Sequence, residues 1–208
     1  MEYSEKELAM RNRKKEIIQA TLELAAKNGM GTVSMQQIAD KLGITKASLY
    51  NHFSSRDEIV DAMYEFLRKT SKENANIGEI DYDQLTADRT LNTILTDAVN
   101  SYKSIVTDPQ MFQFYSIIMS ERAINSAAAE IMVRETRTMI NATKTLFYAL
   151  QVKRIADFGN VDAAAFSFAM AIHAILEYAF DMERAGLKAD WGMMQGYINE
   201  FSRIYQAG

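Results

Sequence analysis

Six hydrogen-bonding side chains follow one another closely over a short segment: Thr45, Lys46, Ser48, Tyr50, Asn51 and His52. Hydroxyl, amide, ammonium and imidazole groups of this kind bind the base edges and phosphates of double-stranded DNA. A helix over these residues would expose most of them on one face. The chemistry that the segment suggests is therefore recognition of DNA, and the alternative is a polar helix face that contacts only water.

The distribution of charge bears on whether this segment can approach DNA. The 208-residue chain has a net charge of −4. From Arg11 to Arg56, 8 basic residues stand against 3 acidic ones, whereas after residue 60 there are 14 basic and 19 acidic residues. Arg13, Lys14 and Lys15 lie with Arg11 at the start of an expected helix, where the helix dipole disfavours cations. Contact with phosphates would explain them, and a solvated charged end is the alternative.

The composition predicts an all-α protein and argues against catalysis. The chain has a single proline and is rich in Ala, Leu, Met, Ile, Glu and Lys, which favour helices. It has no cysteine, and its two histidines, His52 and His173, lie far apart in the sequence, so we expect no metal site. It contains no GxSxG, HExxH, phosphate-binding glycine loop or cofactor fingerprint. We therefore expect no cofactor and no enzymatic activity.

The elements that must position the polar segment are two short helices joined by a tight turn. Ser34 and Gln37 have the spacing of a capping box that begins the first helix. Gly43 permits the left-handed turn after Leu42, and Thr45 is placed to cap the second helix. Small Ala39 allows the helices to approach, and apolar side chains fill the space between them: Ile38, Leu42, Ile44, Leu49 and Phe53. This pattern predicts a helix-turn-helix.

The remaining periodicity brings the expected total to about nine helices. Besides the two short helices, we expect helices at 11–28, 55–73, 84–106, 109–122, 124–151, 161–185 and 190–206. Ser55 and Glu58 form a second expected capping box, and the polar stretch Asn74–Asp83 around Gly78 is the expected boundary between domains. We therefore predict an N-terminal three-helix DNA-binding domain (1–55), a connecting helix (55–73) and a helical ligand-binding and dimerisation domain (74–208).

The sequence VSMQQIADKLGITKASLYNHF, from Val33 to Phe53, followed by Ser55–Ile59, resembles the tetracycline-repressor (TetR) family. The resemblance covers about residues 11–68. It implies a homodimer that binds a partly palindromic operator and places the helix after Thr45 in the major groove. The partner that the resemblance implies is double-stranded operator DNA.

The resemblance also implies individual roles. Thr45, Lys46, Ala47 and Ser48 occupy groove-facing positions, although the family often has glycine at position 47. Tyr50 and His52 match a pair that contacts the DNA backbone, and Arg56 stands where the family usually has lysine. The expected DNA-binding residues are Ser34, Gln36, Thr45, Lys46, Ala47, Ser48, Tyr50, Asn51, His52 and Arg56.

Two C-terminal helices are expected to form the dimer interface. The last helix carries a heptad seam of apolar residues, which requires a partner helix: Trp191, Met194, Ile198, Phe201 and Tyr205. The preceding helix is apolar on two sides, one with Phe166 and one that we assign to the partner: Phe168, Ile172, Ile175 and Ala179. The alternative is that both helices pack only within one subunit.

The middle helices concentrate flexible and aromatic side chains that suit a small hydrophobic or amphipathic ligand. The candidates are Tyr102, Phe112, Tyr115, Met119, Met139 and Phe147. His173 and Glu177 lie one helical turn apart and could bind a polar group of the ligand. The same residues suit an ordinary core, so the pocket rests mainly on the family resemblance.

The expected function is that of a homodimeric repressor that a ligand releases from its operator. One alternative is an architectural or protein-recruiting DNA-binding protein without an effector, and another is an α-helical small-molecule enzyme. We expect a cytoplasmic protein and no membrane association, because the charged start Met1–Glu7 lacks a secretion signal. The apolar stretch Ala163–Phe180 includes polar groups such as His173 and Glu177 and is expected to be a buried helix.

Overall fold

The computed structural model describes residues 5–75 and 81–207, and its regular elements within these ranges are all helices. The expected all-α fold is therefore confirmed, with ten α-helices in the described ranges against about nine expected. They are α1 (Glu5–Asn28), η1 (a 3-10 turn, Met30–Thr32), α2 (Met35–Leu42), α3 (Lys46–Tyr50), α4 (Arg56–Asn74), α5 (Tyr82–Thr86), α6 (Leu91–Val106), α7 (Pro109–Glu121), α8 (Ser126–Val152), α9 (Val161–Arg184) and α10 (Gly192–Tyr205). Gly78, in the expected domain boundary, lies outside the described residues.

The structure divides one expected helix into two. The sequence predicted a single helix over 84–106, but α5 ends at Thr86 and α6 begins at Leu91. Between them, Asp88 has a φ of 52°, which is incompatible with a right-handed helix. The hydroxyl of Thr90 accepts a hydrogen bond from the backbone N–H of Thr93 at 3.2 Å and so caps the start of α6.

The chain forms two compact units. Unit 1 comprises residues 1–74 and 105–133, and unit 2 comprises residues 75–104 and 134–208. Unit 1 therefore includes the four N-terminal helices together with α7 and the first part of α8. The sequence had placed α7 and all of α8 in the second predicted domain, 74–208.

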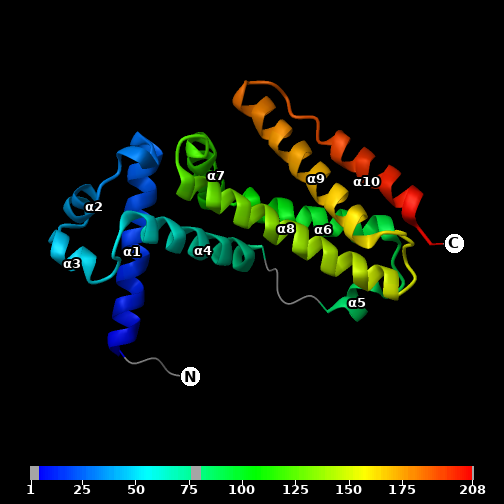
Figure 1. The fold of residues 1–208 in the computed structure, drawn as a ribbon, viewed down its shortest axis with the longest axis horizontal. Helices are drawn as coiled ribbons and strands as arrows, with labels where there is room; N and C mark the ends of the chain where they lie inside the picture. The colour runs from blue at the N-terminus through cyan, green and yellow to red at the C-terminus, as the bar shows by residue number, and fades with distance from the viewer. Residues whose placement is uncertain (1–4, 76–80, 208) are drawn as a thin grey trace. The chain divides into compact units, whose positions relative to one another are not determined.

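The helix-turn-helix of unit 1 begins with the expected capping box. The backbone N–H of Gln37 donates to the Ser34 hydroxyl at 3.3 Å, and the Gln37 side chain accepts from the Ser34 backbone N–H at 2.8 Å. Gly43 ends α2 in the left-handed conformation, with a φ of 63°. Thr45 caps α3 by accepting the backbone N–H of Ser48 at 3.1 Å. The predicted helix-turn-helix is confirmed and lies beside α1 (Figure 1).

The core of this motif is formed by the apolar side chains that the sequence identified. Ile38, Ala39 and Leu49 are fully buried, and Phe53 is buried as expected. An ion pair between Lys41 Nζ and Glu23 Oε2, 2.8 Å apart, joins α2 to α1. The hydrogen bond from Lys41 lowers the pKa of the Glu23 carboxyl below its ordinary value.

The start of α4 differs in one respect from the expected capping box. Ser55 accepts the backbone N–H of Glu58 at 3.1 Å, as predicted. The Glu58 carboxylate does not return to Ser55 but accepts the backbone N–H and the hydroxyl of Ser54, at 2.6 and 2.7 Å. The reciprocal bond therefore reaches one residue further back, where it secures the turn that leads from α3 into α4.

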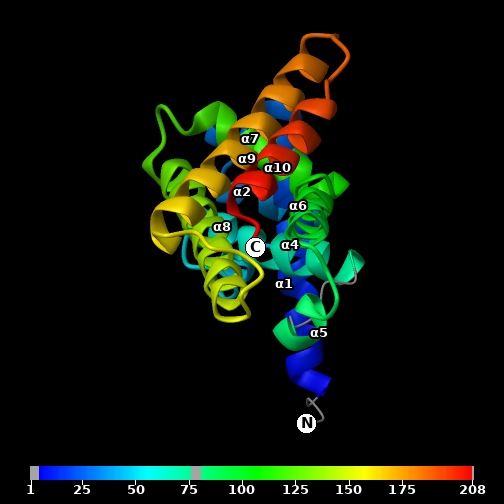
Figure 2. The ribbon, with the colours of Figure 1, turned by 90° about the vertical axis from the view of Figure 1, so that its right-hand side faces the viewer.

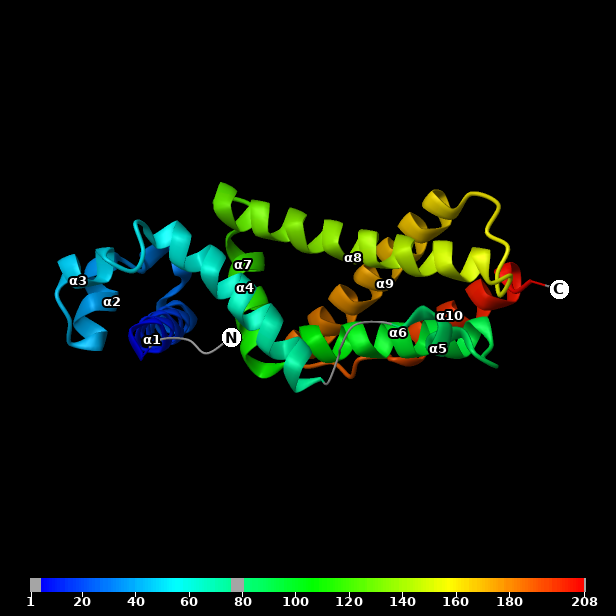
Figure 3. The same ribbon diagram turned by 90° about the horizontal axis from the view of Figure 1, so that it is seen from below.

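Helix α7 packs against α1 and α4 within unit 1 (Figure 3). The Gln110 side chain donates to that of Gln19 on α1 at 3.0 Å. The ring of Tyr64 on α4 lies 6.3 Å from that of Phe114 on α7, and both side chains are buried. These contacts make α7 part of the scaffold that supports the helix-turn-helix.

Unit 2 has an aromatic core. The rings of Phe147 and Phe158 are stacked with centroids 4.3 Å apart, and Phe168 lies 4.8 Å from Phe201. Helices α9 and α10 lie side by side (Figures 1 and 2). At the end of α10, the carbonyl of Tyr205 accepts a hydrogen bond from the backbone N–H of Asp157 at 2.9 Å. This bond joins the end of α10 to the α8–α9 connection.

Candidate nucleic-acid interface

The candidate interface is the exposed side of α3 and the turn that follows it. Helix α3 has only five residues, so its position depends on its caps and on the buried side chain of Leu49 rather than on its own helical hydrogen bonds. The turn after it continues to the buried ring of Phe53, which fixes the exit of the chain. The motif therefore holds its outer side chains on a rigid base.

The residues predicted to contact bases or phosphates lie together on this surface. The exposed members are Thr45, Lys46, Ala47, Tyr50 and Asn51, and the half-buried members are Ser48 and His52. Lys46 Nζ lies 5.9 Å from the centroid of the Tyr50 ring, so the ammonium group and the aromatic face are neighbours. A cation, hydroxyls, an amide and an imidazole thus share one outward surface, which suits the donor and acceptor pattern of a DNA groove.

Ser34 and Gln36 flank this surface at the start of α2 and are both exposed. Each already has a partner within the helix. Ser34 serves as the N-cap, and the Gln36 side chain donates to Asp40 Oδ1 at 2.7 Å. Their contact with DNA stays a prediction, and the bond to Asp40 leaves the Gln36 amide one further N–H donor and its carbonyl oxygen.

Arg56 is turned toward the α1–α2 connection. Its guanidinium donates to the carbonyls of Met30 and Gly31 at 3.3 and 3.4 Å and lies 3.5 Å from Asp57 Oδ1. The side chain is half-buried. This position gives Arg56 a structural role in holding η1, and contact with DNA stays a prediction.

Two lysines of α1 lie over aromatic rings of the same unit. Lys14 Nζ is 5.0 Å from the centroid of Phe53, and Lys15 Nζ is 5.7 Å from that of Phe66. Arg13 instead pairs with Glu16 at 2.6 Å. These basic residues lie inside α1, which begins at Glu5 and not at residue 11, so the expectation that they stand at the start of a helix is corrected. Neighbouring side chains partly hold them, and Lys14 brings a positive charge next to Phe53.

Sequence reasoning missed Glu121, the last residue of α7. Its carboxylate is buried, and its Oε1 accepts the backbone N–H of Gly31 at 2.6 Å. Its Oε2 accepts the Asn125 side chain at 3.3 Å. Ninety residues separate Glu121 from Gly31, so no local pattern could have revealed the bond.

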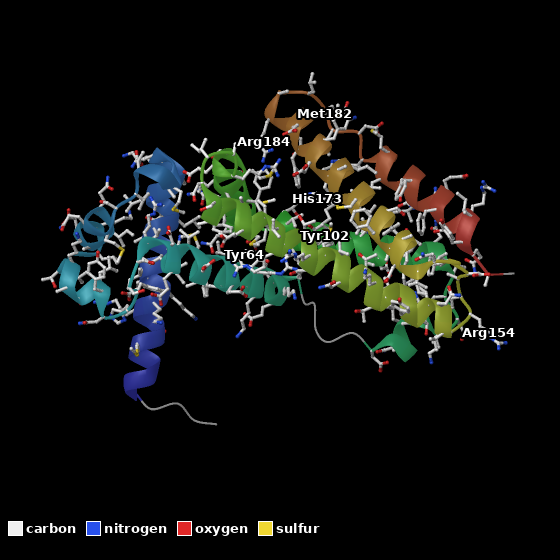
Figure 4. The ribbon with its side chains drawn as sticks, viewed as in Figure 1. Tyr64, Tyr102, Arg154, His173, Met182 and Arg184 are labelled. Carbon is white, nitrogen blue, oxygen red and sulfur yellow. The ribbon has the colours of Figure 1, made fainter. Side chains whose placement is uncertain are left out.

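The candidate ligand residues are distributed over both units. Phe112, Tyr115 and Met119 belong to unit 1, whereas Tyr102, Met139, Phe147, His173 and Glu177 belong to unit 2. Figure 4 labels Tyr102 on α6 and His173 on α9. His173 Nε2 lies 3.4 Å from Glu177 Oε1, as a structural pair would. Phe147 is fully buried in the aromatic core of unit 2, stacked on Phe158, and its contact with a ligand stays a prediction.

The residues assigned to the dimer interface mostly face the core of their own unit. Phe168, Ile172, Ala179, Met194, Ile198 and Phe201 are buried within the chain, while Ile175, Trp191 and Tyr205 are half-buried. The six buried side chains are therefore not available to a partner, and this assignment is corrected. The sequence had identified both apolar sides of α9, but the outward side is the one that carries Phe166, which is 53% exposed, as is Tyr178.

Two further features of the described residues concern membrane insertion and metal binding. One helix, Val161–Arg184, is long and apolar enough to cross a membrane, which is weak evidence because core helices share these properties. Among the described residues, no group of three or more His, Cys, Asp or Glu side chains is placed to hold a metal ion.

Comparison with known proteins agrees with this geometry. Residues 17–63 match the family model described as bacterial regulatory proteins, tetR family. Over 75 residues the chain is 33% identical to the nucleoid occlusion factor SlmA of Edwardsiella ictaluri. The aligned segment covers 36% of this chain and 38% of that protein. The chain thus matches well under half the length of this curated relative.

The fold is shared over nearly the whole chain. A crystal structure described as a TetR-family transcriptional regulator from Mesorhizobium loti superposes with a TM-score of 0.69 at 16% identity and covers 95% of this chain and 98% of that one. The flavonoid-responsive regulator FrrA gives a TM-score of 0.72 at 19% identity, covering 94% and 97%. The helix-turn-helix of this chain thus matches the model of the tetR family of bacterial regulatory proteins, and nearly the whole chain shares the fold of these two solved regulators.

Proposed function

We propose that the chain is a homodimeric, sequence-specific DNA-binding regulator of transcription that acts in the cytoplasm. The observation that carries this proposal is the surface of α3 and its following turn, where Lys46, Tyr50 and Asn51 are exposed on a capped helix whose base is buried. The excess of basic residues between Arg11 and Arg56 supports attraction of this unit to phosphates despite the negative charge of the whole chain.

The test is a fluorescence-anisotropy titration of the full chain against the intergenic DNA upstream of its own gene, with a scrambled duplex as control, across a salt series. We expect the upstream DNA to bind at least about a thousandfold more tightly than the scrambled duplex, and both affinities to fall as salt rises. Equal affinity for the two duplexes at every salt concentration would refute a sequence-specific regulator.

The outward side of α9 supports a homodimer. Phe166 and Tyr178 lie twelve residues apart on this side, each about half exposed, with small Ala174 exposed between them. Met193 and Ile204 on the adjacent α10 are also exposed. A second copy of the same surface is the occupant that we propose, because a two-fold dimer places two recognition helices on successive turns of one DNA face.

We further propose that a small hydrophobic or amphipathic ligand releases the dimer from DNA. Tyr102, His173 and Glu177 in unit 2 remain candidate contacts, and the name of FrrA describes a regulator of this fold that responds to flavonoids. A ligand that favours one spacing of the two α3 helices would shift the population away from the DNA-binding form. Flavonoids and other aromatic amphipathic compounds should be screened by thermal shift and then added to the anisotropy assay. Unchanged operator affinity with every bound compound would count against release by a ligand.

The similarity to a protein named as a nucleoid occlusion factor favours a second candidate, an architectural or protein-recruiting DNA-binding protein without a small-molecule effector. Chromatin immunoprecipitation of the tagged chain separates the two candidates. A few peaks next to promoters would support the regulator, and many dispersed peaks away from promoters would support the second candidate.

A further inference from the structure

We propose that Glu121 is a positioning residue for DNA recognition: its carboxylate on α7 fixes the α1–α2 turn and thereby sets the orientation of the helix-turn-helix. This inference rests on the proposed DNA-binding function, but it concerns a residue outside the helix-turn-helix and about seventy positions from α3. Both ends of the contact lie within unit 1.

The Glu121 carboxylate binds the backbone of the α1–α2 turn directly. Glu121 Oε1 lies 2.6 Å from the backbone nitrogen of Gly31, the central residue of η1. A hydrogen bond to an ionised carboxylate is shorter and stronger than one between neutral groups. The Glu121 side chain is only 9% exposed, so its carboxylate would lose a hydrogen bond that water could not readily replace.

Two side chains of opposite charge, one an acceptor and one a donor, bind the backbone of this turn. The Glu121 carboxylate accepts the Gly31 N–H, while the Arg56 guanidinium donates to the carbonyls of Met30 and Gly31. Met30 and Val33, on either side of Gly31, are buried. The turn is therefore bound through the Gly31 N–H by α7 and through two of its carbonyls by α4, while its apolar side chains are buried.

Only a few residues of the chain separate this turn from α2, and α2 leads into α3. Ser34, the N-cap of α2, follows Gly31 by three residues, and α2 leads through Gly43 directly into α3. A change in the direction of η1 would tilt α2 about its first turn and displace α3 with it. Because base readout requires donors and acceptors to be placed within fractions of an ångström, a tilt would reduce sequence-specific binding more than general binding to phosphates.

The space around Gly31 agrees with a contact built for close approach. A Cβ atom at residue 31 would lie 3.6 Å from Glu121 Oε1, in van der Waals contact with the carboxylate. Gly29, which precedes the turn, has a φ of 82° that favours glycine.

The experiment compares the wild-type chain with Glu121→Ala and Glu121→Gln. Glu130→Ala is the matched control, because Glu130 is an exposed carboxylate on α8 within the same unit. Two quantities are measured on each full-length chain. One is the hydrogen-exchange rate of the Gly31 amide, and the other is the ratio of affinities for the upstream duplex and the scrambled duplex.

We expect Glu121→Ala to raise the Gly31 exchange rate by about tenfold and to lower the affinity ratio by about tenfold, with little change in scrambled-duplex affinity. Glu121→Gln keeps an acceptor of the same size and should show both changes at about threefold, which keeps the test valid if the alanine variant fails to fold. Glu130→Ala should match the wild type in both measurements.

The outcomes separate this inference from the proposed function. A wild-type chain without sequence preference refutes the proposed function before any variant is compared, and this inference falls with it. A wild-type chain that selects its operator, combined with Glu121 variants of unchanged affinity ratio or unchanged Gly31 exchange, overturns this inference alone.

Discussion

Several polar side chains of the recognition segment have a structural duty that limits what they can offer DNA. The Thr45 hydroxyl accepts the backbone N–H of Ser48, and the Ser34 hydroxyl accepts that of Gln37. Lys46 and Tyr50 have no such duty to the helix caps, and both are exposed. At the scale of residues, we therefore expect Lys46 to contribute most to base selection and Tyr50 to contribute through its hydroxyl to phosphate binding.

This division predicts different consequences for two substitutions. Tyr50→Phe should weaken binding to operator and scrambled DNA by a similar factor, about fivefold, because it removes one phosphate hydrogen bond. Lys46→Ala should lower operator affinity by about 10- to 100-fold and change which base is preferred at one position. Anisotropy titrations against a set of single-base operator variants measure both effects. Lys27→Ala, an equal loss of charge at the last turn of α1, is the control, and equal losses for Lys46→Ala on all duplexes would contradict the assignment.

The Glu58 carboxyl provides a pH-dependent prediction at the same scale. Hydrogen bonds from the side chain and backbone of Ser54 lower the pKa of Glu58 below its ordinary value of 4.5. Because the folded state favours the ionised form, this group stabilises the protein at pH values above 4.5, and its contribution is lost as the pH falls through the lower folded-state value. The loss therefore occurs in acid and leaves neutral pH unaffected.

Denaturant unfolding of the wild type and of Glu58→Gln between pH 3 and 7 tests this sign. The difference in stability between the two chains should shrink as the pH falls below about 4.5. Ser54→Ala removes the hydroxyl donor but keeps the backbone N–H, so its pH dependence should lie between the two. A difference that grows toward low pH would contradict the assignment.

At the scale of elements, α9 shows how a helix that is apolar nearly all round divides its surface. Phe168 and Ile172 face the aromatic core of unit 2, whereas Phe166 and Tyr178 face outward. Large apolar side chains that stay exposed on a helix whose opposite face already forms the core of unit 2 are candidates for an interaction surface. This division is the physical basis of the proposed dimer.

Phe166→Asp should therefore dissociate the dimer without unfolding the chain. A charge at a buried interface opposes association, whereas in the free subunit the same side chain meets solvent. Light scattering after size-exclusion chromatography should give about half the mass of the wild type, and circular dichroism should report an unchanged helix content. Val152→Asp, at the exposed end of α8, is the control. A variant that stays dimeric would place the interface elsewhere.

At the scale of the whole molecule, the proposed dimer would recognise DNA through the spacing of its two subunits on one duplex. Two α3 helices that enter successive major grooves must be separated by about one helical turn, or a multiple of it. Inserting about 5 base pairs between operator half-sites should rotate one half-site to the opposite face of the DNA and lower affinity at least about a hundredfold. Inserting a full turn of about 10 base pairs should be less harmful, and equal affinity for both insertions, measured by anisotropy, would argue against a rigid dimer.

Much of the recognition unit could be predicted from the sequence because its determinants are local. The Ser34–Gln37 capping box, the left-handed Gly43 and the Thr45 cap each depend on residues within about four positions of one another. The buried set of Ile38, Ala39, Leu49 and Phe53 followed from helical periodicity. The family resemblance rested on the same short segment, which is the part that the family model matches.

The tertiary structure decided the features that depend on contacts between distant residues. Periodicity identified two apolar sides of α9 but could not tell which one faced the core, because both sides bury similar side chains equally well. Arg56 and Glu121 reach the α1–α2 turn across 25 and 90 positions of sequence, and no local pattern encodes either contact. The sequence by itself determined the helix-turn-helix and most of the other helices through short-range hydrogen bonds and hydrophobic spacing. Only packing decided which faces are free and which residues support that surface, because burial is a property of the whole chain.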